Sequence, residues 1–201
     1  MTPPKTQRTK VTVTDIEAAF ARSFLVNGYR GTSVDAVAKE LGVPKGSIFY
    51  HIGTKEAVFF RVQMAGMREF TNRLRDIANT SEPAEIRLRE AIRDSVRRVD
   101  PTAGPLFAMS RDNHHLPPEH AAELEAVRRE YQALFTGIVE DGVEAGTFRR
   151  QEHLKVVIFG ILRFIGLVRD WYRADGELSL NELADVYWAF ICRGLGHEVE
   201  G

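Results

Sequence analysis

Apolar residues recur at three- and four-residue intervals along most of the chain, which is the spacing of one face of an α-helix. This pattern predicts an all-α fold. We expect helices over residues 14–27, 34–41, 45–51, 55–78, 82–96, 106–110, 119–145, 153–172 and 180–193.

Polar residues and glycines mark the expected ends of these helices. Side chains that accept hydrogen bonds from the free N–H groups of a first turn are expected to act as caps, and they are Thr14 with Glu17, Ser33, Thr54, Ser81, and Ser179 with Glu182. Gly28, Gly42 and Gly146 stand where a left-handed residue would end a helix.

Residues 32–55 combine two short helices with a tight turn between them. Pro44 suits the first turn of the second helix because it has no N–H to lose. Ile48 is the inward anchor of that helix, and its other positions are polar, aromatic or glycine. In a helix–turn–helix the second helix enters the major groove of DNA. The residue types therefore indicate a DNA reader.

The helix at residues 153–172 carries apolar side chains on every face, which is typical of a helix that is buried on all sides. Lys155, Arg163 and Arg169 interrupt it, so it lacks the roughly 18–20 uncharged residues of a membrane span. This helix and the last helix together are more than one small helical domain needs. We expect a symmetric homodimer in which these helices form a four-helix bundle with their copies.

The charge distribution divides the chain. The net charge is only −1, but residues 1–55 hold eight Lys and Arg against four Asp and Glu, and the remainder holds 19 against 24. A basic head on an acidic body suits a DNA reader with a separate second domain. We expect a flexible basic arm at 1–12, a DNA-binding domain at 13–55, and a ligand-binding and dimerisation domain at 56–201.

The motifs that carry enzyme chemistry do not occur in this sequence. It contains no glycine-rich phosphate loop, no H-E-x-x-H and no G-x-S-x-G, so we expect no catalytic residue and no cofactor. The cluster of His114, His115, Glu119 and His120 matches no standard metal spacing, and we predict a solvated loop there. The single Cys192 is expected to be a buried thiol. With no apolar signal core at its N-terminus, the protein is expected to be cytoplasmic.

Residues 13–60 resemble the DNA-binding domain of TetR-family (tetracycline-repressor-like) transcriptional regulators. The resemblance is carried by the run GYRGTSVDAVAKELGVPKGSIFYHIGTKEAVF. It departs from the family at Pro44, where Ser or Thr is frequent, and at Phe49, where Tyr is frequent. The resemblance also implies a homodimer that binds an operator in double-stranded DNA, and we expect a repressor. The alternatives are an all-α enzyme and a ligand-binding or scaffold protein without DNA binding.

Helix position and the matching family positions together predict the DNA contacts. Lys45, Gly46 and Ser47 are expected at base edges, and Thr32, Ser33, Tyr50, His51 and Lys55 at phosphates, with Phe49 in the same interface.

The C-terminal half resembles a branch of TetR regulators in bacterial lipid and steroid catabolism, on LPPEHAAELEAVRREYQALFTGIVEDGVEAGTFR and DWYRADGELSLNELADVYWAFICRGL. Some members of that branch respond to acyl-CoA thioesters, so a small hydrophobic effector is expected. The predicted pocket residues are Met67, Phe70, Leu74, Phe107, Arg111, Tyr131, Phe135 and Arg163. Arg163 has two readings: a ligand contact, or a structural arginine that is ion-paired or reaches water at the dimer seam.

Overall fold

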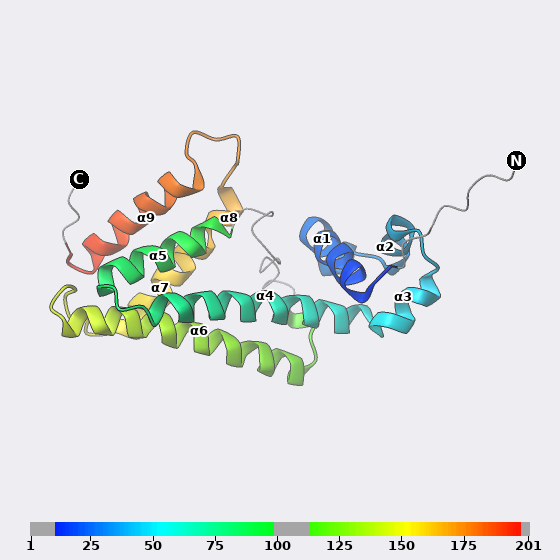
Figure 1. Ribbon diagram of the computed structural model, residues 1–201, viewed down its shortest axis with the longest axis horizontal. Coiled ribbons are helices and arrows are strands. Elements are labelled where there is room, and N and C mark those ends of the chain that lie inside the picture. Colours follow the sequence, from blue (N-terminus) through cyan, green and yellow to red (C-terminus); the bar gives the residue numbers. More distant parts are fainter. Residues whose placement is uncertain (1–10, 99–112, 198–201) are drawn as a thin grey trace, which may run out of the picture. The chain divides into compact units, whose positions relative to one another are not determined.

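The computed structural model describes residues 11–98 and 113–197, and the regular elements within them are all helical, as predicted. The helices are α1 (Val13–Gly31), α2 (Val34–Leu41), α3 (Lys45–Ile52), α4 (Lys55–Ala78), α5 (Ala84–Arg97), α6 (Pro118–Glu144), α7 (Leu154–Gly166), α8 (Val168–Trp171) and α9 (Leu180–Gly194) (Figure 1). The helix predicted at residues 106–110 lies outside the described residues, and so does the predicted arm up to residue 10.

These helices form two compact units. The first unit holds the described residues 11–66 and 113–124, and the second holds 67–98 and 125–197. The division falls within α4 and within α6. The first unit therefore continues past the expected domain end at residue 55 and includes the start of α6.

The core of the first unit is built on the predicted apolar face of α1. Ile16, Phe20 and Phe24 are at most 1% exposed, and Phe24 meets Phe59 of α4 edge-on with ring centroids 5.2 Å apart. Ile48 of α3 is fully buried in the same unit. Burial of each large apolar side chain contributes about 1.5–3 kcal/mol. These side chains therefore supply most of what holds the short helices in place.

Three of the predicted caps are confirmed. The backbone N–H of Ala36 donates to the Ser33 hydroxyl over 3.0 Å, and Thr54 caps α4 in the same way. Ser179 and Glu182 form the expected capping box of α9. Gly42 ends α2 with a φ of 65°, where a side chain would be strained.

Two other cap predictions are wrong. The capping box of α1 is formed by Thr12 and Asp15, two residues before the predicted pair. The Asp15 carboxylate accepts from the Thr12 backbone N–H over 2.8 Å, and this bond lowers the pKa of Asp15. Ser81 does not cap α5, because that helix begins after Pro83, whose N-cap position carries no side-chain hydrogen bond.

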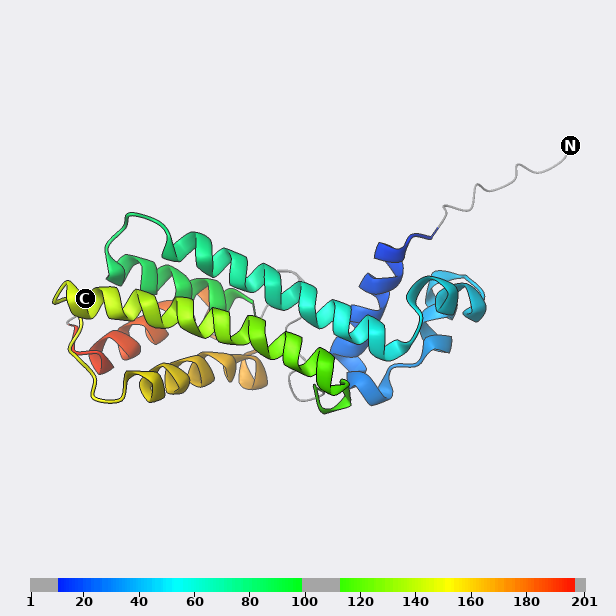
Figure 2. The ribbon, with the colours of Figure 1, turned by 90° about the horizontal axis from the view of Figure 1, so that it is seen from below.

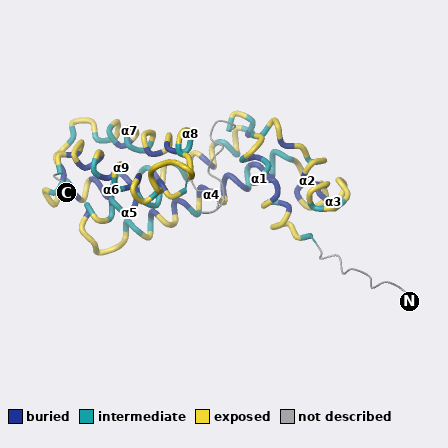
Figure 3. The backbone as a smooth tube through the Cα atoms, turned by 90° about the horizontal axis from the view of Figure 1, so that it is seen from above, coloured by how far each residue is buried: buried dark blue, intermediate teal, exposed yellow. Residues whose placement is uncertain are grey.

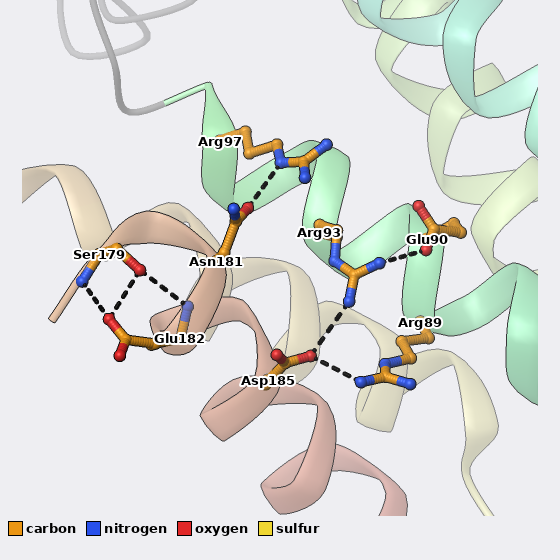
Figure 4. A network of polar contacts seen from close by, with 8 residues as sticks. All are labelled: Arg89, Glu90, Arg93, Arg97, Ser179, Asn181, Glu182 and Asp185. Atoms are coloured by element: carbon orange, nitrogen blue, oxygen red, sulfur yellow. Dashed lines mark hydrogen bonds and ion pairs between the residues drawn. The ribbon is translucent and has the colours of Figure 1, made fainter.

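The second unit packs the C-terminal part of α4 and helices α5 to α9 together. Within it α6 runs alongside α4 (Figure 2), and the rings of Phe70 and Tyr131 stack at 4.2 Å. Helix α5 lies against α9, where Arg89 and Arg93 both donate to Asp185 (Figure 4). The thiol of Cys192 is buried there as predicted, and burial raises its pKa to about 12.

The prediction that the helix at 153–172 is buried on every side is wrong for the single chain. Val156 of α7 is 68% exposed, Leu167, which directly follows α7, is 53% exposed, and Phe190 of α9 is 64% exposed. Figure 3 shows exposed stretches along α7. The apolar pattern is present along the helix, but in a single chain the described residues leave one face of the helix uncovered. In the described part of the chain, no helix is long and apolar enough to cross a membrane.

The contact between α5 and α9 leads to a pH-dependent prediction. The hydrogen bond from Arg89 is the main cause that lowers the pKa of Asp185 below its ordinary 3.8. The bond therefore stabilises the fold at neutral pH, and this contribution is lost as pH falls through the lowered value. Because the carboxylate is half exposed, we expect Asp185→Asn to cost at most about 1 kcal/mol at pH 7.

The free energy of unfolding, measured in urea from pH 7 down to pH 3, checks this expectation. The difference between wild type and Asp185→Asn should shrink below about pH 4. The matched control is Asp175→Asn. Asp175 and its partner Arg173 are both mostly exposed to solvent, so this variant should unfold with the same free energy as wild type. A cost at Asp185 that stays constant with pH would contradict the electrostatic account.

Candidate nucleic-acid interface and effector site

Helix α3 presents its predicted DNA-facing residues on one exposed surface. Ile48 and Ile52 are at most 3% exposed and fix the inward side of the helix. The other positions are exposed, apart from the half-buried Ser47, and they are Lys45, Gly46, Ser47, Phe49, Tyr50 and His51. A β-carbon added at Gly46 would meet no atom within 4 Å, so a flat partner can approach the backbone closely there. The structure thus brings these six predicted residues together.

Lys45 is the cation of that surface. Its ammonium lies 2.7 Å from the Asp35 carboxylate of α2 and 6.0 Å from the centre of the Phe49 ring. Both partners of the ion pair are at least half exposed, and such pairs contribute only about 0–1 kcal/mol. Lys45 can therefore exchange Asp35 for another acceptor at little cost.

Thr32 and Ser33 have roles within the fold. Thr32 is only 2% exposed, and its hydroxyl donates to the Gly28 carbonyl over 2.9 Å. A phosphate contact by this hydroxyl, as predicted from the sequence, would require both the burial and the bond to be lost. The Ser33 hydroxyl is exposed but already accepts the α2 cap bond, which leaves its proton free to donate.

Lys55 differs most from its predicted role. Its ammonium donates to the Tyr29 carbonyl over 2.9 Å and to the Thr32 carbonyl over 3.0 Å, and it lies 4.3 Å above the Tyr29 ring. These contacts bind the first residue of α4 to the junction of α1 and α2. The structure thus gives Lys55 contacts within the fold that the sequence reasoning did not include, and its expected phosphate contact stays a prediction.

Arg61, about one and a half turns further along α4, contacts α1 and the end of α3. Its guanidinium donates to Glu17 of α1 over 2.6 Å and reaches the carbonyl of Ile52 at the end of α3 at 3.5 Å. Sequence reasoning missed this residue, because a helical period shows which face is polar but not which distant carboxylate it meets.

Residues just before and at the start of α6 make aromatic contacts within the first unit that the sequence did not predict. His120 stacks on Phe60 at 4.0 Å and hydrogen-bonds Glu56 over 2.8 Å, and His115 stacks on Tyr29 at 4.6 Å. The loop predicted to be solvated thus makes specific contacts with α1 and α4. Among the described residues, no group of three or more His, Cys, Asp or Glu side chains is placed to hold a metal ion.

Five of the predicted effector residues form one buried group in the second unit. They are Met67, Phe70, Leu74, Tyr131 and Phe135, each at most 7% exposed. Arg163 is exposed on α7, and it is near enough to α6 for its charge to help lower the pKa of Arg128, which burial lowers most. Phe107 and Arg111 lie outside the described residues.

A polar cluster beside this apolar group was missed by the sequence reasoning. The Arg98 guanidinium lies 4.1 Å from the centre of the Phe70 ring, and the Tyr131 hydroxyl is 3.0 Å from that of Ser95. Asp94, four residues before Arg98, completes the cluster. Burial raises the pKa of Tyr131 and lowers that of Arg98. The i, i+4 spacing of Asp94 and Arg98 was the signal that could have revealed it.

A groove of about 320 Å³ lies elsewhere in the second unit, over α4, α5 and α6. Arg87 and Asp141 form an ion pair of 2.8 Å beside it, and Ala133 and Gly137 line its floor. Among the described residues, none of the predicted effector contacts lines this groove.

Sequence-family comparisons match both halves of the chain. Residues 16–62 match the family described as "Bacterial regulatory proteins, tetR family", and residues 81–195 match "Tetracyclin repressor-like, C-terminal domain". The HTH-type transcriptional repressor KstR2 of Rhodococcus jostii (strain RHA1) is 25% identical over 203 residues, which cover 97% of this chain and 98% of KstR2.

Solved structures share the fold. The ketosteroid transcriptional regulator KstR2 of Mycobacterium tuberculosis superposes with a TM-score of 0.79 at 20% identity, over 93% of this chain and 96% of its own. AibR, solved in complex with isovaleryl coenzyme A and operator DNA, gives 0.80 at 21% identity, over 89% and 96%. The relatives compared are transcriptional regulators.

The position of Lys55 gives a test that separates its two roles. Lys55→Met removes two hydrogen bonds from a charged donor to backbone carbonyls, and such bonds contribute about 1.5–3 kcal/mol each. We expect amide hydrogen exchange in residues 29–52 to accelerate, with no change in residues 180–194. The measurement is exchange mass spectrometry on the full chain without DNA.

The matched control is Lys45→Met, because Lys45 is exposed and its carboxylate partner stays in water. It should leave the exchange unchanged. If Lys55→Met also keeps wild-type protection and only weakens DNA binding, the phosphate contact predicted from the sequence is correct and the positioning role is wrong.

Proposed function

Because the chain belongs to the TetR family of bacterial regulatory proteins, we propose that it is a repressor that binds a palindromic operator as a homodimer and is released by a small hydrophobic effector. The DNA-binding part of this proposal rests on the exposed surface of α3, whose opposite side is anchored by the buried side chains of Ile48 and Ile52. The repressor KstR2 and the AibR complex with operator DNA support it.

On DNA, α3 lies in the major groove with its N-terminal residues at base edges. Lys45, Gly46 and Ser47 are at that end, and the Lys45 ammonium suits the O6 and N7 acceptors of guanine. Ser33, Tyr50 and His51 are exposed and can donate to phosphates. Lys55 then acts indirectly, by holding the α1–α2 junction against α4.

The homodimer is proposed to form through the uncovered face of α7 and α9. That face carries Val156, Phe159 and Phe164 on α7, Leu167 directly after it, and Val186 and Phe190 on α9, each at least 36% exposed. Phe164 and Phe190 lie together with ring centroids 5.1 Å apart, so the two helices share one apolar surface. Contiguous exposed apolar surface of this kind marks an interaction site.

The effector is proposed to occupy the second unit beside the buried group of Phe70, Leu74 and Phe135. Those side chains lie on α4 and α6, the two helices that also contribute to the DNA-binding unit. A mostly apolar wall with a few polar groups suits a fatty or sterol-like body with an anionic or thioester-linked end. The AibR complex with isovaleryl coenzyme A supports this class. Arg163, being exposed, is suited to an outer group such as the phosphates of a coenzyme A thioester.

Release requires a difference in affinity between two states of the protein. A ligand that binds both states equally shifts nothing, however tightly it binds. A 100-fold preference for the DNA-incompetent state corresponds to a coupling of about 2.7 kcal/mol.

The first prediction concerns Lys45. Lys45→Ala should weaken operator binding by about 1–3 kcal/mol and relax base preference at one position, because a base-edge contact is lost. The control, Lys39→Ala on α2, removes an exposed charge outside α3 and should change specific and random DNA equally. Fluorescence anisotropy on operator and shuffled duplexes measures both. Equal losses on the two duplexes for Lys45→Ala would contradict base reading.

The second prediction concerns the dimer. Phe190→Glu places a charge on the shared apolar surface, so it should lower both the dimer fraction and operator affinity. Val26→Glu on α1 is the control, because Val26 is 79% exposed and belongs to the first unit. Sedimentation velocity at micromolar concentration measures the dimer. A wild-type monomer that binds the operator would rule out this interface.

The third prediction concerns the effector. Long-chain acyl-CoA thioesters, fatty acids and steroid acids, titrated into the protein–operator complex, should include a ligand that releases the DNA. Electrophoretic mobility shift measures the release, and glucose and zinc chloride are the negative controls. Release by the sugar or the metal, with none by the lipophilic ligands, would overturn the effector class.

A further inference from the structure

The C-terminal end of α5 carries a polar cluster inside the second unit that the proposed DNA and dimer surfaces do not use. Asp94 and Ser95 come from α5, Arg98 is the C-cap residue that follows it, Arg73 comes from α4, and Tyr131 comes from α6. The Asp94 and Arg98 side chains are only 11% and 14% exposed. Charged groups are rarely buried to this extent unless they are fully paired.

The protons of the two hydroxyls in this cluster are both used in hydrogen bonds within the protein. The Ser95 hydroxyl donates its one proton to the Ala91 carbonyl over 2.7 Å. The Tyr131 hydroxyl, 3.0 Å from the Ser95 oxygen, then donates its own proton to Ser95. Neither hydroxyl has a proton left for a ligand.

Arg98 is not satisfied in the same way. Its Nε donates to Asp94 over 3.2 Å, but its Nη2 is buried and has no hydrogen-bond partner among residues 11–98 and 113–197. Burial is the main cause that lowers the pKa of this guanidinium. A buried donor without an acceptor destabilises the folded state, and more so when it is charged. A folded protein usually provides such a group with a partner.

The charge of the cluster defines that partner. Arg73 and Arg98 both contact Asp94, so within the described part of the chain two positive charges meet one negative charge. The excess of one positive charge excludes a metal cation and matches one carboxylate. A phosphate dianion would leave an excess negative charge in a buried place, which is costly. The Phe70 ring that lies against the guanidinium adds an apolar wall.

We infer that Arg98 binds the carboxylate of an apolar organic acid, whose body lies beside the buried apolar residues of α4 and α6. The inference rests on the proposed function and narrows its effector to a free acid. Nη2 of Arg98 donates to the carboxylate, which neutralises the excess charge, and Asp94 keeps its contact with Arg73 throughout.

The experiment uses three probes with one chain length: decanoate, 1-decanol and decanoyl-CoA. Isothermal titration calorimetry on the full-length protein should give decanoate an affinity about tenfold or more above that of decanol, the value of one hydrogen bond to a charged donor. Arg98→Met keeps the apolar stem and removes the donor, so it should bind the acid and the alcohol equally. Arg98→Lys keeps the charge and should retain part of the preference.

Arg97→Met is the matched control. Arg97 precedes Arg98 on the same helix but is exposed and donates to Asn181 over 2.9 Å (Figure 4). It should keep the full preference for the acid.

Thermal unfolding without ligand separates binding from a structural role. Removal of an unsatisfied buried charge should leave the melting temperature of Arg98→Met unchanged or raised, because Asp94 stays paired with Arg73. A structural arginine predicts the reverse: a lower melting temperature and an unchanged preference for the acid. That pair of results would overturn the inference.

The probes also distinguish the inference from the proposed function. If decanoyl-CoA binds and releases the operator while decanoate does not bind, Arg98 is not the anchor, the proposed function stands, and the anionic contact returns to Arg163. If wild type binds decanoate and decanol equally, the inference is likewise wrong. If none of the three probes binds, both the inference and the proposed lipophilic effector class are wrong.

Discussion

A recognition helix of eight residues cannot hold its own shape in water, because isolated helices shorter than roughly 12 residues are marginal. Everything that α3 does therefore depends on what packs behind it. Ile48 and Ile52 supply the burial, and α4 supplies two cations that bind its neighbours: Lys55 at the α1–α2 junction, and Arg61 at Glu17 and the end of α3. The same α4 carries Phe70 in the second unit. A single continuous helix thus takes part in both the DNA-reading unit and the proposed effector site.

Two features of the chain reduce the stability of a lone, ligand-free molecule. One is the apolar surface of α7 and α9, and the other is the buried Arg98 donor without an acceptor. Proteins keep such features where function requires them, since stability alone would favour their removal. A second copy of the chain would cover the first feature, and an acid would satisfy the second. Both features therefore indicate binding partners of this protein.

Local chemistry was readable from the sequence, and long-range pairing was not. The caps at Ser33, Thr54 and Ser179 and the bounds of α4 were predicted because each depends on residues within one turn of the chain. Lys55 was assigned to phosphate because its charge is visible in the sequence, whereas the Tyr29 and Thr32 carbonyls that engage it lie 23 or more residues away. The apolar residues of α7 predicted burial on every side, but their count could not show that several of them are exposed in the single chain. Arg98 was missed because the Phe70 ring that lies against it belongs to another helix, 28 residues earlier in the chain.

The central claim is that this chain reads a specific DNA sequence, and equilibrium binding to the DNA upstream of its own coding sequence tests it most directly. Purified protein would be titrated into a labelled upstream fragment and into a shuffled fragment of equal composition, at one fixed physiological salt concentration. The account predicts saturable binding to the upstream fragment, about a thousandfold or more tighter than to the shuffled one. Equal affinity for the two fragments, falling in parallel as salt is raised, would show charge attraction alone and contradict it.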